Sequence, residues 1–306
     1  MLASNCYLIV PTYNAGTIWQ SWIDAVLHQQ VISPAQVLVI DSSSTDNTLA
    51  LAQQAGFRTH SIAKKEFNHG ATRNLAFTLC PDAQILIFLT QDAILATDNS
   101  IETLVAAFEQ EAVAVVFGRQ LPHTDATRIA AHARLFNYPA MSYIRCLTDV
   151  AQYGIKTVFC SNSFAAYRRE CLEEIGGFPN DVILSEDTYV AAKLVKQGYL
   201  IAYHAQAAVY HSHNYSLTQE FRRYFDIGVF HAQQPWIRNE FGAAEGEGKK
   251  FVLSELAYLW QYSRLITPQA MLRTLFKWLG YRLGIEYQHL PRELCKRLSM
   301  HRGFWL

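Results

Sequence analysis

Short runs of apolar residues alternate with longer segments of helical spacing over the first 118 residues. Runs such as 37–40 and 85–89 are continuously apolar, which is typical of strands buried on both faces of a parallel sheet. The intervening segments place apolar residues three or four positions apart, as amphipathic helices do. This order predicts a mostly parallel α/β sheet flanked by helices. The predicted strands are 6–11, 36–40, 58–62, 84–89 and 113–117, and the predicted helices are 17–29, 45–55, 70–79 and 100–111.

The alternation of strand and helix patterns ends after residue 118. Residues 119–157 predict an insertion of helices and loops, and the chain from 216 onward is helical. We therefore predict one domain over 1–235 and a helical C-terminal region over 236–306. The remaining predicted elements are strands at 157–159, 164–167, 199–203 and 207–211, a helix that stops at Gly176-Gly177, a helix starting near Ser185, and helices at 216–232, 250–265, 268–285 and 291–300.

Composition and charge narrow the class of protein. Half of the 306 residues are hydrophobic and the formal net charge is zero, which argues against a general nucleic-acid binder. The charge is unevenly spread, because residues 249–306 carry ten Lys/Arg against three Asp/Glu. Basic, aromatic-rich helices favour an anionic membrane surface. The alternative for 236–306 is an all-protein helical subdomain or a homo-oligomer contact.

Cysteine usage and hydropathy indicate a compartment. The six cysteines are scattered without a C-x-x-C pair, which fits free thiols in a reducing environment better than structural zinc. The N-terminus has no basic segment followed by an apolar one, so we expect no signal peptide. No stretch reaches about 18 uninterrupted apolar residues. These features predict a cytoplasmic protein, peripheral on the inner face of the membrane if the C-terminal helices bind lipid.

Two acidic residues follow predicted strands, where an open α/β sheet binds its ligands. Asp41 follows 36–40 and precedes the cap-like residues Thr45 and Asp46, so its carboxylate is free to accept the ring N–H of a pyrimidine base. Asp92 follows 84–89 and suits Mg²⁺ or Mn²⁺ held together with phosphate oxygens. Helix capping for Asp41 and a simple turn for Asp92 are the structural alternatives.

Three further segments carry candidate chemistry. Arg73 falls in the first turn of a helix that follows Gly70, which suits a diphosphate. Asp187 begins another helix and suits a general base, or else only the helix dipole. His211, in the pair His211-Ser212-His213, suits the same metal as Asp92, or else is an ordinary histidine.

The order and spacing of these segments resemble the family-two inverting glycosyltransferases of the GT-A fold, over roughly residues 5–230. Within that family, the segment 67–74 together with 90–93 is similar to bacterial rhamnosyltransferases that use dTDP-L-rhamnose. The segments that carry the resemblance are Pro11-Thr12-Tyr13-Asn14, Val39-Ile40-Asp41, Phe67-Asn68-His69-Gly70 with Thr72-Arg73-Asn74, Thr90-Gln91-Asp92-Ala93, Gly176-Gly177-Phe178, Glu186-Asp187 and His211.

The resemblance implies a role for each matched residue. Asp41 would contact the nucleotide base with Thr12 beneath it, Arg73 would lie near the diphosphate, and Asp187 would be the catalytic base. Asp92 would hold both donor and metal, and His211 would complete the metal site. The implied reaction transfers L-rhamnose, with inversion, to a lipid-linked saccharide of O-antigen or another cell-surface polysaccharide.

One departure from the family's pattern concerns the metal. A D-x-D motif would need an acid at Thr90 or Ile94, and Gln91 replaces a neighbouring acid, so strict metal dependence is open. Two alternatives to the dTDP-rhamnose donor remain: a UDP-hexose or UDP-N-acetylhexosamine donor, or a non-catalytic nucleotide-sugar-binding scaffold. A nicotinamide dehydrogenase is disfavoured because no G-x-G-x-x-G follows the first strand.

Overall fold

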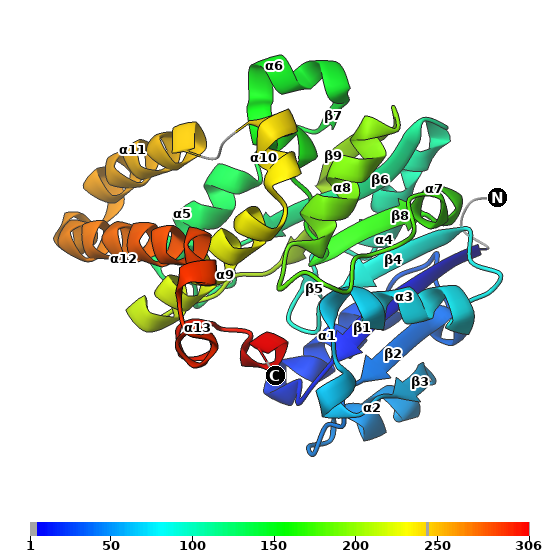
Figure 1. Ribbon diagram of the computed structural model, residues 1–306. Coiled ribbons are helices and arrows are strands. Elements are labelled where there is room, and N and C mark those ends of the chain that lie inside the picture. Colours follow the sequence, from blue (N-terminus) through cyan, green and yellow to red (C-terminus); the bar gives the residue numbers. More distant parts are fainter. Residues whose placement is uncertain (1–4, 243–244, 306) are drawn as a thin grey trace.

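The computed structural model describes residues 5–242 and 245–305, and places nine strands of these residues in one mixed sheet (Figure 1). The strand order is β3-β2-β1-β4-β8-β6-β9-β5, and β7 pairs with β9. The strands are β1 (Cys6–Thr12), β2 (Val37–Asp41), β3 (Arg58–Ser61), β4 (Ile85–Leu89), β5 (Ile94–Leu95), β6 (Val113–Leu121), β7 (Tyr143–Arg145), β8 (Phe164–Arg168) and β9 (Leu200–Tyr210).

Helices cover both faces of the sheet, and the last of them gather to one side of it (Figure 1). The α-helices of the described residues are α1 (Trp19–Leu27), α2 (Thr48–Gln54), α3 (His69–Leu79), α4 (Ser100–Val105), α5 (Arg128–Asn137), α6 (Val150–Tyr153), α7 (Arg169–Glu174), α8 (Glu186–Lys196), α9 (Leu217–Gln233), α10 (Pro235–Phe241), α11 (Glu245–Tyr262), α12 (Thr267–Ile285) and α13 (Arg292–Leu298).

Strand directions bring several loop segments to one edge of the sheet. Strands β3, β2, β1 and β4 are parallel, so their carboxyl ends share an edge. Strand β8 runs antiparallel between β4 and β6, with Phe164 opposite Leu89, so its amino end lies at that same edge. Ligands bind at this edge in open α/β sheets.

Two apolar clusters, one on each face, hold the sheet between its helices. One cluster contains the stacked rings of Trp19 and Trp22 from α1, whose centroids are 4.6 Å apart. The other contains Phe88 and Phe117 of the sheet together with residues of α8 and α9. The strands β2 and β4 are buried along their whole length, as their uninterrupted apolar sequences predict.

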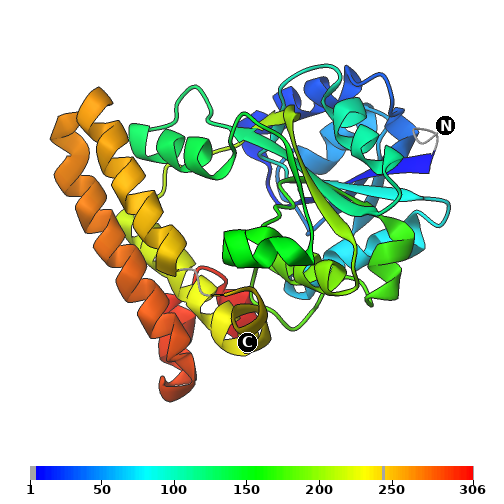
Figure 2. The same ribbon diagram turned by 90° about the horizontal axis from the view of Figure 1, so that it is seen from above.

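The C-terminal helices attach to the rest of the fold where α9 crosses α12. A Cβ atom at Gly280 would lie 2.3 Å from the Phe221 carbonyl oxygen, and one at Gly284 would lie 2.0 Å from that of Phe225. Only glycine permits so close an approach of the two backbones. Helices α11 and α12 then run side by side, away from the N-terminal strands (Figure 2). None of the described helices is long and apolar enough to cross a bilayer.

The structure corrects several predicted elements. Predicted strand 157–159 is wrong, because Gly154–Val158 forms a 3₁₀ helix whose buried residues are as apolar as those of a strand. The predicted strands 199–203 and 207–211 are one strand, β9, whose register against β6 shifts beside Gly118. Helix α10 was not predicted. The predicted insertion 119–157 contains the end of β6 and all of β7. The proposed division at residue 235 stays a prediction.

Candidate functional site

Asp41 and Thr12 lie side by side where β2 and β1 end. The two residues are paired in the parallel register, and both are buried. Thr12 Oγ1 donates to one Asp41 carboxylate oxygen at 3.1 Å, and the hydroxyl and backbone N–H of Ser44 donate to the carboxylate at 2.5 and 2.8 Å. Asp41 is therefore a fixed anion at the carboxyl end of the sheet. The N-cap of the helix that follows is Asn47, whose side chain forms no capping bond, and Asp46 accepts from the Thr48 N–H at 3.0 Å.

Gln91, which replaces an acid of the family's pattern, joins the loops after β1 and β4. Its side-chain carbonyl accepts from the Tyr13 N–H at 2.8 Å, and its amide donates to the Tyr13 carbonyl at 3.2 Å. The Tyr13 hydroxyl in turn accepts from Lys64 Nζ at 2.6 Å. An uncharged amide can both donate and accept, which a carboxylate cannot do. The side chain of Gln91, one residue before Asp92, is thus bonded to the Tyr13 backbone.

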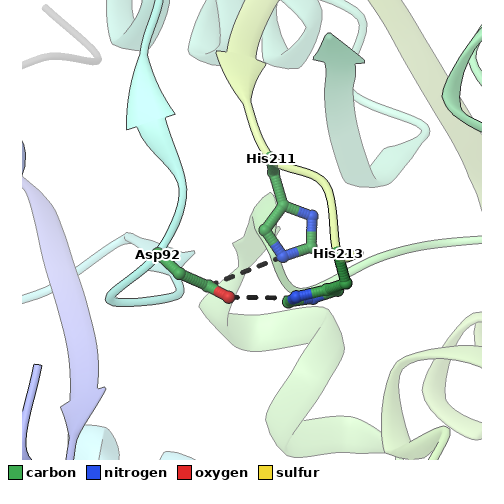
Figure 3. Close-up of side chains that lie close together, drawn as sticks. All are labelled: Asp92, His211 and His213. Atoms are coloured by element: carbon green, nitrogen blue, oxygen red, sulfur yellow. Dashed lines mark ion pairs between the residues drawn. The ribbon is translucent and has the colours of Figure 1, made fainter. Parts of the chain in front are cut away.

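Asp92 faces two histidines from the loop after β9 (Figure 3). Its carboxylate oxygens lie 3.5 Å from His211 Nε2 and 3.7 Å from His213 Nε2. One atom from each of the three side chains lies within 4.8 Å of the other two. The sequence predicted Asp92 and His211 as metal ligands but not His213, although the H-x-H spacing was the available signal.

The tautomer of His211 is fixed by Gln120. The Gln120 side-chain carbonyl accepts from Arg134, and its amide donates to Ser161, so His211 Nδ1, 2.9 Å from that carbonyl, must be the donor. His211 Nε2 therefore presents a lone pair to Asp92. Such support of a histidine through its other ring nitrogen is typical of metal ligands.

The protonation states of Asp92, His211 and His213 leave the group with a negative charge and no positive one. Burial lowers the pKa of His211, and burial lowers the pKa of His213 to about 4, so both imidazoles are neutral near pH 7. Burial would raise the pKa of Asp92, but a proton on His211 or His213 would outweigh burial and bring that pKa below its usual value, so the carboxylate loses its proton before the imidazoles do. A carboxylate and two imidazole lone pairs thus converge without a proton between them. This donor set fits a divalent metal ion.

Asp187 lies at the start of α8, beside a buried ion pair. Glu186 is 3.0 Å from Arg73, which also donates to the His69 carbonyl at 2.8 Å. Burial would raise the pKa of Glu186, but Arg73, His69 and Asn162 bring it down to about 2. Arg73 is only 5% exposed and points at this carboxylate. The ion pair therefore keeps a full negative charge next to Asp187.

The surroundings of Asp187 make it a weaker acid than usual. Its carboxylate accepts from the Asn162 N–H at 3.1 Å and the Thr188 N–H at 2.7 Å. Burial and the charge of Glu186 nevertheless raise its pKa to about 6. Ser185 is the N-cap residue of this helix, with a left-handed backbone at φ of 61°, but its side chain forms no capping bond. A raised carboxyl pKa in a site is the property of a general base.

The C-terminal end of the chain also reaches this part of the molecule. Buried Asp226 of α9 accepts from the N–H groups of Met300 and His301 at 2.9 and 3.2 Å. This turn places His301 Nδ1 3.5 Å from Nε2 of His69, the first residue of α3. Sequence reasoning missed this contact, because the two histidines are far apart in the chain and neither has a metal-ligand neighbour.

The predicted residues share the sheet edge described above. Asp41 and Thr12 end β2 and β1, and Asp92 follows β4. Asn162, which binds Asp187, lies two residues before β8, and the Ser163 carbonyl accepts from the Thr90 N–H at 3.3 Å. A nucleotide site, a metal site and a base along one edge are the parts that a nucleotide-sugar-dependent transferase needs.

Comparison with known proteins identifies the class. The model of "Glycosyl transferase family 2" matches residues 7–176, so the chain belongs to this family of glycosyltransferases and has the GT-A fold predicted from its sequence. It is similar to the mannosyltransferase PcManGT from Pyrobaculum calidifontis, solved with GDP-Man and Mn²⁺: TM-score 0.62, 17% identity, covering 92% of this chain and 87% of that one. Residues 1–349 of S. aureus TarS match with TM-score 0.54 and 15% identity, covering 97% and 83%.

Two curated relatives match nearly the whole chain. The O-antigen chain rhamnosyltransferase RfbN of Salmonella typhimurium is 50% identical over 299 residues, which covers 97% of this chain and 95% of the relative. The O-antigen chain rhamnosyltransferase WbaN of Salmonella anatum is 49% identical, with the same coverage. Both relatives are named as O-antigen chain rhamnosyltransferases, the kind of enzyme that the sequence motifs predicted.

Proposed function

We propose that this glycosyltransferase transfers L-rhamnose from dTDP-β-L-rhamnose to a lipid-linked oligosaccharide, with inversion, in the synthesis of an O-antigen or a similar cell-surface polysaccharide. The names of the two relatives and their near-complete coverage support the sugar and the pathway. The segment 67–74, with its match to dTDP-rhamnose enzymes, supports the donor. Inversion of a β-linked donor gives an α-rhamnoside.

The observation that carries the proposal is the state of Asp187. Its pKa of about 6 leaves it ionised near pH 7 yet basic enough to accept a proton. Asp187 removes the proton of the acceptor hydroxyl as that oxygen forms a bond to the anomeric carbon. The bond from the anomeric carbon to the diphosphate breaks, and its electron pair leaves on dTDP.

The donor lies along the same edge of the sheet. Asp41, supported by Thr12, accepts the ring N–H of the base, and Asp92 lies at the diphosphate. The prediction that Arg73 lies near the diphosphate stays open, because its guanidinium faces Glu186. Asp92 and His211, joined by His213, hold the metal ion. Two imidazoles favour Mn²⁺ over Mg²⁺. The ion supplies positive charge to the diphosphate.

The test is release of dTDP by the purified protein with Mn²⁺, dTDP-rhamnose and a lipid-pyrophosphate saccharide acceptor. UDP-glucose and UDP-N-acetylglucosamine serve as competing donors. The proposal expects turnover with dTDP-rhamnose and abolition of that turnover in Asp187→Asn. Turnover only with a UDP-sugar would overturn the donor. Nucleotide binding without turnover of any donor would favour the scaffold alternative.

We also propose that the C-terminal helices bind an anionic membrane surface at the cytoplasmic face. None of the six cysteines, which all lie among the described residues, forms a disulfide, and this suits a reducing compartment. Exposed Arg264 and Arg282 lie on the same two-helix segment as a set of exposed apolar side chains, and this combination fits anionic lipid. The exposed apolar residues of this lipid face are Leu253, Trp260, Leu265, Met271, Leu275 and Trp278.

Sedimentation with lipid vesicles tests the lipid face. Binding to phosphatidylglycerol vesicles, weaker binding to phosphatidylcholine, and loss of both in Leu265→Ser with Trp260→Ser are expected. Met141→Ser is the matched control, because Met141 is 78% exposed but lies outside these helices. Unchanged sedimentation of the double variant would contradict lipid binding by this face. A wild-type dimer that the double variant loses, measured by light scattering, would instead assign the face to a contact with a second copy.

A further inference from the structure

The positively charged side chains near the candidate metal site differ in whether they already bind protein partners. Arg73 pairs with Glu186, and Lys64 donates to the Tyr13 hydroxyl. Arg134 donates to Gln120, which supports His211. A departing diphosphate needs a cation whose donors are free to contact it. These three side chains already serve protein partners.

Arg223 of α9 differs from them. It is exposed, and among the described residues its guanidinium forms no ion pair. Its central carbon lies 6.0 Å from the centroid of the Tyr215 ring. The Tyr215 ring stacks on His213, with centroids 4.9 Å apart and planes 24° apart. His213 faces Asp92 at 3.7 Å. A continuous stack therefore joins Arg223 to the candidate metal ligands.

The charge of Arg223 extends across the site toward the base. Burial lowers the pKa of His69 and His301, and the positive charge of Arg223 lowers each of them further. His69 contributes its carbonyl to Arg73, which pairs with Glu186 beside Asp187. Asp226, one helical turn after Arg223, holds the turn that carries His301. Arg223 thus lies between the metal ligands and the side of the site that holds the base.

We propose that Arg223 binds a diphosphate next to the Asp92–His211–His213 group. This inference rests on the proposed function, since it names a further residue for the same reaction. A guanidinium offers two parallel N–H donors that match phosphate oxygens, and Tyr215 holds its plane in place. The diphosphate belongs to the nucleotide donor or to the lipid carrier of the acceptor, because both present the same chemistry.

The experiment compares Arg223→Met and Arg223→Lys with Arg222→Met in the full chain. Arg222 is the matched control, because its side chain points about 100° away around the helix. Calorimetric titration with dTDP and Mn²⁺ tests whether Arg223 binds the donor diphosphate. The KM of an acceptor that carries a lipid pyrophosphate, compared with the KM of an acceptor without one, tests whether Arg223 binds the carrier diphosphate. Arg223 is exposed, so we expect all three variants to melt like the wild type.

A donor diphosphate predicts that Arg223→Met weakens dTDP binding at least tenfold, roughly the loss of one charged hydrogen bond, with partial retention in Arg223→Lys. A carrier diphosphate predicts unchanged dTDP binding and a similar rise in KM for the lipid-pyrophosphate acceptor alone. The inference would be overturned if Arg223→Met and Arg222→Met had the same dTDP affinity and the same acceptor KM. Failure of the proposed function would appear separately, as absent turnover in the wild type, while the dTDP titration still decides the role of Arg223.

Discussion

Asp92 and Asp187 lie along one edge of the same sheet, but their surroundings move their pKa values in opposite directions. Two imidazoles flank Asp92, and a proton on either one would hold the Asp92 pKa below the usual value against the effect of burial. Burial and the neighbouring anion Glu186 raise the pKa of Asp187 to about 6. One carboxylate is thereby kept ionised and the other is made basic.

The difference shows how one site separates two kinds of chemistry. A carboxylate beside neutral nitrogen ligands suits a metal ion, which needs lone pairs without protons. A carboxylate beside a like charge suits proton transfer. The Arg73–Glu186 ion pair makes this possible, because it keeps Glu186 ionised inside the protein. The comparison predicts distinct losses when each side is altered.

The largest effect is expected at Asp187. Asp187→Asn removes the base and keeps one oxygen, which can accept from the Asn162 N–H or from the Thr188 N–H; in the wild type each donates to a different carboxylate oxygen. We expect kcat to fall roughly 1000-fold, the middle of the range for a positioned general base. Steady-state rates of dTDP release measure this. A variant with more than a tenth of the wild-type kcat would exclude Asp187 as the base.

The second effect tests the metal side. Gln120→Leu removes the acceptor that holds His211 Nδ1–H and leaves the three ligands in place. We expect the Mn²⁺ concentration for half-maximal activity to rise about 10- to 100-fold, as for other groups that support metal ligands. Saturating Mn²⁺ should restore most of kcat. An unchanged Mn²⁺ requirement would mean that His211 is not a ligand.

The third effect concerns pH. Because Asp187 must be ionised to accept a proton, kcat/KM should fall as pH drops through about 6, the value to which burial and Glu186 raise its pKa. Glu186→Gln keeps partners for Asn162 and Arg73 but removes the like charge. The acidic limb of the profile should then move down by about one pH unit. Profiles that superimpose would contradict electrostatic coupling of the two acids.

The smallest effect is expected at His301. His301→Ala removes the contact with His69, whose carbonyl positions Arg73. We expect kcat to fall by about tenfold or less through misplacement of the base, with dTDP affinity unchanged. His301→Asn, which places an amide near the position of Nδ1, should recover part of the loss. His289→Ala is the control, with a side chain 80% exposed in the same C-terminal region; equal rates for both alanine variants would exclude a role for His301.

Much of the fold follows from periodicity. The buried strands β2 and β4 have uninterrupted apolar sequences, and the Gly176-Gly177 stop has φ of 86° and 76°, as a glycine terminus requires. Two errors have physical causes. Thr157 and Val158 are buried in a 3₁₀ turn, so composition alone could not distinguish this turn from a strand. The prediction divided β9 into two strands because the polar residues His204 and Gln206 interrupt its apolar sequence. These residues lie where the register of β9 against β6 shifts.

The site was predicted where a residue follows a strand or begins a helix. Asp41, Asp92 and Asp187 were predicted in this way; each has contacts in keeping with its position, and their roles stay predictions. His213, Arg223 and His301 were not found, because their relevance depends on ring stacking and on the path of the C-terminal helices. The burial of Arg73 was equally hidden, since its partner Glu186 is distant in sequence.

The separate roles of the two carboxylates are tested most directly by calorimetric titration of dTDP in the presence of Mn²⁺. The wild type, Asp92→Asn and Asp187→Asn would be compared under the same conditions. We expect Asp187→Asn to bind as tightly as the wild type, and Asp92→Asn to bind at least tenfold more weakly because it loses a charged ligand. Equal affinity in all three proteins, or weaker binding only in Asp187→Asn, would contradict the division of labour between them.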